Sequence, residues 1–276
     1  MTVPSQAIVS TFNYVGAEET RPAYYLYKVD PAVVKPLPDK QKCRMQIQDC
    51  RPDMANYDLD VQGFAFGNFQ PTPLDYYDGE SVRQQYYPQV AQLVQAWTGA
   101  SQVTVFDHNV RFDPKASQPQ RGADRPVRFV HNDYTEISGP QRVKDILGDS
   151  AAATLLGQRF AFINVWRPIS GPVLDMPLGI LDARSLQPDN FVATDLIYAD
   201  RTGEVSSVRH RPEHRWHYLS AMQTDEVLFL KCFDSDTGGR TRYGAHSAFA
   251  DPTTPADAPP RESIEARTLV FFGAED

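Results

Sequence analysis

Cysteine is scarce in this chain, with only Cys43, Cys50 and Cys232 among 276 residues. The number is odd, and no two of the three have the Cys-x-x-Cys spacing of zinc ribbons and redox motifs. A disulfide framework and a cysteine-based zinc site are therefore excluded, and we expect free thiols that are mostly packed in the interior.

Long apolar runs and clusters of basic residues are also missing. No stretch reaches about 18 consecutive apolar residues, which excludes an obvious transmembrane helix. The first ten residues lack the charged and apolar regions of a secretory signal. The net charge is −8 and the Lys and Arg residues are dispersed, so binding to a phosphate backbone is not expected. We expect a cytoplasmic protein whose partner is a small molecule and neither nucleic acid nor a membrane, and we leave a homodimer open.

What the sequence does contain is a series of short apolar and aromatic runs. At least seven of them follow residue 100 and are typical of strands. Before them, Tyr86, Val90, Val94 and Trp97 recur at helical spacing, and Gly99 ends the pattern. Strands and helices do not alternate regularly, which favours an antiparallel double-sheet barrel over a Rossmann-type fold.

The chain shows no internal repeat and no low-complexity segment. The Pro-rich stretch 251–260 lies between two strands and is typical of a loop. We therefore expect a single domain over 1–276, in which about 1–100 supplies strands and a helix that flank a core formed by about 101–276. The runs 215–219 and 226–233 predict a hairpin linked by residues 222–225.

The segment 128–135 places His131 and Asp133 two residues apart. On a strand, two such side chains point to the same side of the sheet. An imidazole, a carboxylate and a second histidine form the facial arrangement that holds non-haem Fe(II) and leaves three coordination positions open. A solvated His–Asp hydrogen bond would give the same pair, so the third ligand decides between the two interpretations.

Later histidines compete for that third position: His210, His214, His217 and His246. Arginines crowd the first three, and their positive charge opposes the binding of a cation. His246 lies at the start of a strand, upstream of Arg261 and Ser263. A guanidinium and a hydroxyl two residues apart on a strand face the same way and suit a carboxylate, so His246 is the predicted third ligand.

The order His131-x-Asp133, His246, Arg261-x-Ser263 resembles that of the Fe(II)/2-oxoglutarate-dependent oxygenases. Within that superfamily the chain looks like the branch with cephem methoxylase components, a fungal gibberellin desaturase and a fungal meroterpenoid endoperoxide-forming oxygenase. The resemblance runs from about residue 100 to the C-terminus and more loosely before it. The matching blocks, in the same order, are 130–135, 164–168, 177–182, 214–218, 231–235, 246–249 and 260–267.

The resemblance implies a mostly β fold with flanking helices and a double-stranded β-helix (jelly-roll) core. It implies Fe(II) as the metal, with 2-oxoglutarate and O2 as co-substrates. It also implies that Arg261 and Ser263 anchor the far carboxylate of 2-oxoglutarate. Fifteen residues separate His246 from Arg261, more than is usual in the superfamily, and Arg267 is the competing anchor.

The same resemblance points to secondary metabolism and to oxidation of a small natural product. Hydroxylation, desaturation, ring closure and O2 insertion all remain open, because the motifs do not select among them. Asn164 and Trp166 are expected beside the co-substrate, and Tyr134, Arg167 and His217 beside the substrate. Core packing is the alternative for Trp166, and a salt bridge to Asp182 is the alternative for Arg167. Two rival functions are an iron oxidase that uses no 2-oxoglutarate and a non-enzymatic cupin-like binding protein.

Overall fold

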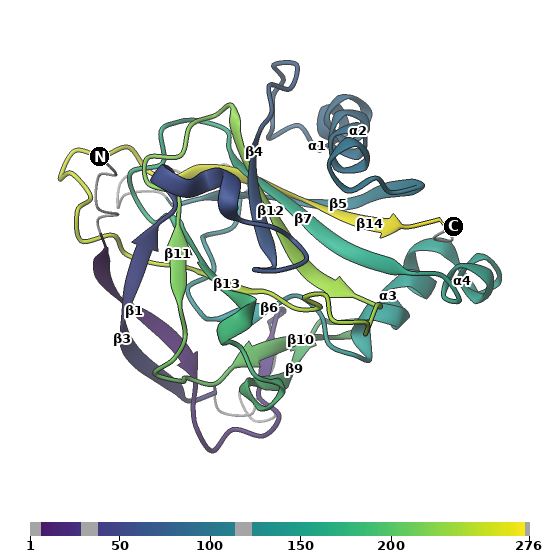
Figure 1. Cartoon of the computed structure of the whole chain (residues 1–276), viewed down its shortest axis with the longest axis horizontal. Helices are drawn as coiled ribbons and strands as arrows, with labels where there is room; N and C mark the ends of the chain where they lie inside the picture. Colours follow the sequence, from purple (N-terminus) through teal and green to yellow (C-terminus); the bar gives the residue numbers. More distant parts are fainter. Residues whose placement is uncertain (1–6, 29–37, 114–122, 274–276) are drawn as a thin grey trace.

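The computed structural model describes residues 7–28, 38–113 and 123–273. In these ranges the chain forms two facing β-sheets with helices along one side (Figure 1). The strands are β1 (Ile8–Val15), β2 (Ala23–Tyr25), β3 (Lys40–Asp49), β4 (Phe64–Asn68), β5 (Gln102–Phe112), β6 (His131–Asn132), β7 (Phe160–Pro168), β8 (Leu178–Leu181), β9 (Phe191–Ile197), β10 (Thr202–Val208), β11 (Trp216–Tyr218), β12 (Glu226–Asp234), β13 (Ala245–Ala248) and β14 (Glu262–Phe271). The helices are α1 (Gly79–Ser81), α2 (Tyr87–Thr98), α3 (Ser138–Leu147) and α4 (Asp149–Leu155), with a π-helical turn η2 (Val82–Tyr86) between α1 and α2 and the 3₁₀ turns η1 (Arg51–Asn56), η3 (Ala183–Ser185) and η4 (Pro188–Asn190).

The core strands alternate between the two sheets along the chain. The smaller sheet has the order β4-β12-β7-β14-β5, and all its pairings are antiparallel. The larger sheet has the order β1-β3-β11-β8-β13-β6-β10-β9-β2. From β5 to β8, and again from β12 to β14, each strand lies in the sheet opposite to the strand before it. This path is that of a double-stranded β-helix, so the predicted fold class is confirmed.

Strand β7 shows why the two faces of the small sheet differ. All its residues are buried, which is expected of a strand that is covered on both sides. Ile163 and Val165 pack in a cluster with Val90 and Val94 of α2, outside the barrel. Helix α2 ends as predicted at Gly99, which has φ 70° and donates its N–H to the Gln95 carbonyl at 3.0 Å.

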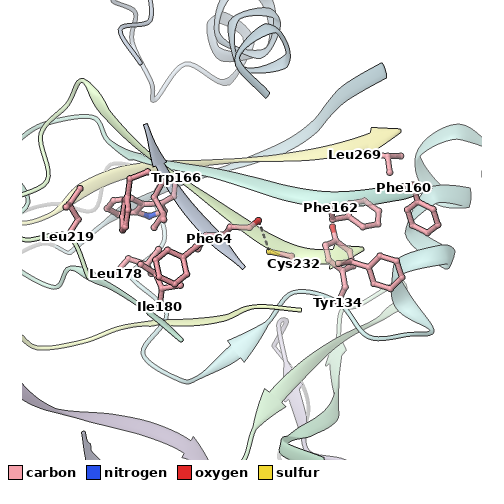
Figure 2. Close-up of a cluster of buried hydrophobic side chains, with 14 of the residues drawn as sticks. Phe64, Tyr134, Phe160, Phe162, Trp166, Leu178, Ile180, Leu219, Cys232 and Leu269 are labelled. Atoms are coloured by element: carbon pink, nitrogen blue, oxygen red, sulfur yellow. Dashed lines mark hydrogen bonds between the residues drawn. The ribbon is translucent and has the colours of Figure 1, made fainter. Parts of the chain in front are cut away.

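The other face of β7 lines the barrel interior. Phe162 and Trp166 project from the same side of the strand into a cluster between the sheets (Figure 2). Leu269 of β14 joins this cluster, whereas Ile264 and Ala266 of the same strand pack with α2. Because side chains alternate along a strand, the odd-numbered residues 261–267 must face the barrel interior as Leu269 does.

The predicted hairpin between 215–219 and 226–233 is wrong. Strand β11 pairs with β3 and β8 in the large sheet, whereas β12 pairs with β4 and β7 in the small sheet. The residues between the two runs do form a turn, but this turn connects strands that lie in different sheets. The N-terminal strands β1 and β3 pair with each other at the edge of the large sheet. None of the helices in the described ranges is long and apolar enough to span a membrane.

Candidate metal centre

Two histidines that are far apart in the sequence meet through the pairing of β6 with β13. His131 and His246 are direct partners in this antiparallel ladder, and their ring centroids are 4.5 Å apart. Asp133 follows β6 immediately, and its Oδ1 lies 3.6 Å from Nε2 of His131. One ligand atom from each of the three side chains lies within 4.8 Å of the others. The structure therefore brings together the three residues that the sequence predicts as ligands.

Hydrogen bonding decides which nitrogen of His131 faces the centre. Its Nδ1 lies 2.9 Å from the Phe129 carbonyl, which can only accept, so Nδ1 carries the proton. Nε2 is then left with its lone pair toward Asp133, as a metal ligand requires. Backbone acceptors commonly fix ligand histidines in this way.

The charge states also suit a divalent cation. Burial, with the positive charge of His246 adding to it, lowers the pKa of His131 to about 4, and burial lowers the pKa of His246 as well. Burial would raise the pKa of Asp133, but Arg267 and the two histidines outweigh it and lower that pKa overall. At neutral pH the site therefore presents two neutral imidazoles and one carboxylate, the donor set of non-haem Fe(II).

A second part of the site surrounds Arg261. This arginine is only 4% exposed, donates to the Met176 carbonyl, and lies with its guanidinium carbon 5.4 Å from the centre of the Trp166 ring. It forms no ion pair with any described residue, and neither its Nε nor the Ser263 hydroxyl has a hydrogen-bond partner there. Burial, with the charge of Arg111 adding to it, lowers the pKa of Arg261 to about 10. The buried guanidinium of Arg261 and the neighbouring Ser263 hydroxyl, which lack such partners among the described residues, therefore favour the binding of an anion.

Charged groups connect the two parts of the site. Burial lowers the pKa values of His131, His246 and Arg261; the charge of Glu265 opposes this lowering at His131 and Arg261, and the charge of Arg111 adds to it at His246 and Arg261. The sequence analysis did not select Glu265 or Arg111. The alternation of side chains along β14 could have identified Glu265, because Glu265 lies on the same face as Arg261 and Arg267.

The remaining predicted residues divide into those that lie beside the metal ligands and those that lie away from them. Asn164 donates to Asp133 Oδ2 at 2.7 Å, and Tyr134, beside the centre, stacks on Phe162 with ring centroids 4.2 Å apart. Arg167 lies on the outer face of β7, where it donates to the Tyr76 hydroxyl and the Thr224 carbonyl and makes no pair with Asp182. His217 lies near Tyr57 and Phe64, with Asp182 4.0 Å away. The structure does not bring Arg167 or His217 to the metal ligands.

The buried histidines predict a dependence of stability on pH. Burial is the main reason that the pKa values of His131, His214 and His217 fall to about 4 in the folded chain, against an ordinary value of 6.5. Between these values the unfolded chain binds more protons, so the metal-free protein must lose stability as the pH falls through this window. Each histidine contributes up to about 1.4 kcal/mol per pH unit.

Denaturant unfolding in the presence of a chelator, at pH about 7 and about 5.5, measures this loss. In the described part of the chain, His214 donates from Nε2 to Asn190 Oδ1 and forms a second hydrogen bond between Nδ1 and the Tyr14 hydroxyl, away from the metal ligands. The His214→Gln variant should therefore show a shallower decline. Equal unfolding free energies at both pH values in the unaltered chain would contradict the buried, neutral state of these imidazoles.

A double-stranded β-helix with His-x-Asp and a distal histidine inside it defines a mononuclear non-haem iron enzyme. Comparisons with known proteins agree. A family model described as an oxidoreductase/YMDC permease-like domain matches residues 12–271. The Fe(II)/2-oxoglutarate-dependent dioxygenase nvfI of Aspergillus novofumigatus is 34% identical over 240 residues, which are 83% of this chain and 84% of that protein. The hydroxylase/desaturase efuI of Hormonema carpetanum is 32% identical over 248 residues, 82% of each protein.

A solved structure agrees with these relatives. The iron and alpha-ketoglutarate-dependent endoperoxidase NvfI superimposes with a TM-score of 0.88 at 30% identity, over 98% of this chain and 100% of that one. The chain belongs to the Fe(II)/2-oxoglutarate-dependent dioxygenases. Its cofactor is Fe(II), and 2-oxoglutarate and O2 are its co-substrates.

Proposed function

We propose that this dioxygenase oxidises a small natural product, with His131, Asp133 and His246 as the iron ligands. The similar proteins named hydroxylase/desaturase and endoperoxidase support a small-molecule substrate in secondary metabolism. The observation that carries the proposal is that the metal donors and a candidate anion-binding group line the same interior of the barrel. This interior presents three clustered metal donors and, just before β14, a buried guanidinium that has no ion-pair partner among the described residues.

Arg261 with Ser263 is the proposed anchor for the far carboxylate of 2-oxoglutarate. Arg261, just before β14, and Arg267, within it, both face the barrel interior, but among the described residues only Arg267 forms ion pairs with carboxylates. Arg267 lies 3.0 Å from Asp107 and 3.4 Å from Glu265. A dicarboxylate would have to displace these acids to reach it, whereas Arg261 would gain an ion-pair partner that it lacks among the described residues.

The chemistry divides between the cofactor and the protein. Fe(II) held by His131, Asp133 and His246 would couple the oxidative decarboxylation of 2-oxoglutarate by O2, which yields succinate and CO2, to the oxidation of the substrate. The protein holds the ligands in the correct protonation state and orients the co-substrate through Arg261. Buried aromatic side chains such as Phe162 and Trp166 keep bulk water out of the barrel.

We further propose that Trp166 forms one wall of the co-substrate pocket. The position of the Arg261 guanidinium against the Trp166 ring supports this role.

We also propose that the chain forms one domain and is cytoplasmic. A net charge of −8 supports a small-molecule partner over nucleic acid. The choice among hydroxylation, desaturation, ring closure and O2 insertion follows from how a substrate sits relative to the iron, and all four outcomes share the same co-substrate chemistry.

Oxygen consumption tests the proposal against an oxidase that needs no keto acid. The protein loaded with Fe(II) should consume O2 and form succinate when 2-oxoglutarate is present, and it should do neither when 2-oxoglutarate is omitted. An oxygen electrode and succinate quantification measure both. Consumption of O2 at the same rate without 2-oxoglutarate would establish the oxidase instead.

A further inference from the structure

The two carboxylate oxygens of Asp133 have different surroundings. Oδ1 faces Nε2 of His131 at 3.6 Å. Oδ2 accepts a hydrogen bond from Asn164 Nδ2 at 2.7 Å, and the Nε of Arg267 lies 3.4 Å from the same oxygen. One oxygen therefore faces the other metal ligands, and the second accepts one hydrogen bond, from Asn164, and forms an ion pair with Arg267.

The pairing of β7 with β14 places Asn164 and Arg267 next to each other. Asn164 of β7 and Arg267 of β14 are direct partners in the antiparallel ladder, and both face the barrel interior. Side chains of directly opposed residues lie side by side, so they can approach one oxygen together. Asn164 is fully buried, and its amide oxygen has no partner among the described residues.

The guanidinium of Arg267 is itself held in place on several sides. One terminal nitrogen donates to Asp107 at 3.0 Å, and the other lies 3.4 Å from Glu265. With the Asn109 amide oriented to present its oxygen, that oxygen accepts from both terminal nitrogens at 2.9 Å. The planar fork is thus fixed by three neighbours, and its Nε lies 3.4 Å from Asp133 Oδ2 as an ion pair without the geometry of a hydrogen bond.

We propose that Asn164 and Arg267 are positioning residues that occupy Oδ2 of Asp133, so that this carboxylate binds the metal through Oδ1 alone. The inference rests on the proposed iron centre, because it uses the same three ligands. A carboxylate that is free of such donors can bind through both oxygens and take up an extra coordination position. Asn164 and Arg267 keep that position for the keto acid and O2.

The test compares the whole protein with Asn164→Leu, Arg267→Met and Arg267→Lys, each loaded anaerobically with Mn(II). Mn(II) is the probe because it accepts the same oxygen and nitrogen ligands. Crystal structures of the loaded proteins should show Asp133 bound through Oδ1 in the wild type and through both oxygens in the Leu and Met variants. Removal of a hydrogen-bonding partner of a metal ligand costs about 10- to 100-fold in metal affinity or activity, and we expect the dissociation constant for 2-oxoglutarate to rise by a similar factor in these two variants.

Arg267→Lys separates positioning from charge. Lysine keeps the positive charge but offers one compact ammonium group instead of a fork. If Arg267 positions Asp133, the lysine variant should behave like the methionine variant. Wild-type affinity for 2-oxoglutarate in Arg267→Lys, with Asp133 still bound through one oxygen, would overturn the assignment for Arg267.

Arg167→Met is the matched control, because Arg167 is a buried arginine on the outer face of β7 that donates to the Tyr76 hydroxyl and the Thr224 carbonyl. It contacts none of the three metal ligands in the described part of the chain, so its 2-oxoglutarate affinity should remain within about threefold of the wild type. Should Asn164→Leu not fold, the Arg267 variants test the inference without it. Failure of the wild type to bind Mn(II) would overturn the metal centre itself, whereas unchanged one-oxygen binding in the Leu and Met variants would overturn only the positioning role.

Discussion

Replacing His246 by alanine is expected to remove Fe(II) from the protein while its fold is retained. The three candidate ligands are the described groups that converge in the barrel, so losing one imidazole leaves a site with two donors. Changes in the surroundings of a metal ligand already cost 10- to 100-fold in affinity, so loss of a ligand should cost more than about 100-fold. Bound iron, measured after anaerobic desalting, should fall from about one ion per chain to nearly none.

A matched control for this variant is His210→Ala. His210 lies beside Tyr14 and His214, outside the barrel, and is not among the clustered donors. It should retain iron as the unaltered chain does. Thermal unfolding of both variants in a chelator checks that the fold persists. Full iron occupancy in His246→Ala would assign the third position to another side chain.

Changing Arg261 to methionine is expected to weaken 2-oxoglutarate binding about 30-fold or more. Loss of one partner of a buried, hydrogen-bonded charge pair costs about 2–5 kcal/mol, and each 1.4 kcal/mol is tenfold in affinity. Anaerobic titration of the iron-loaded variant measures this loss. The unfolding temperature of the metal-free protein should not fall, because the buried guanidinium has no ion-pair partner among the described residues to lose.

Arg167→Met is the matched control, since Arg167 and Arg261 are both 4% exposed. The two terminal nitrogens of Arg167 donate to the Tyr76 hydroxyl and the Thr224 carbonyl, outside the barrel. Its variant should therefore lose thermal stability and keep wild-type affinity for 2-oxoglutarate. If Arg261→Met retains wild-type affinity, Arg267 becomes the anchor and the proposed division of roles on β14 fails.

Local patterns predicted the elements whose residues carry strong signals. The helical spacing of Tyr86, Val90, Val94 and Trp97, with Gly99 after it, predicted α2 and the residue at which it ends. Strand β3 was missed, although Cys43, Met45 and Ile47 alternate with exposed polar residues and are buried. Its many charged and amide side chains hid the alternation, because they face solvent on one side of the sheet.

Sheet membership could not be predicted from local patterns. The hairpin proposed between β11 and β12 had suitable strands and a suitable turn, but such a turn joins paired strands and crossing strands equally well. Crossing depends on which partners bury each strand, and those partners are as distant as β3 and β4. Long-range pairing is set by the whole core and not by the turn.

For the candidate site, too, some features could be predicted from the sequence and others could not. The order of His131, Asp133 and His246 was sufficient to predict the three residues that converge, because the motif and the family resemblance carry that information. The contacts of Asn164 and Arg267 with Asp133 depend on the register between β7 and β14. A shift of that register by one residue would turn one of the pair out of the barrel.

Anaerobic titration of the protein with Fe(II) and then 2-oxoglutarate is the most direct test of the central claim. The ligand set of His131, Asp133 and His246 leaves three positions, so the keto acid should bind through two oxygens and produce a weak visible charge-transfer band. The band should appear in the unaltered chain and be absent from His246→Ala. Iron bound at full occupancy with no band on addition of 2-oxoglutarate would contradict the account.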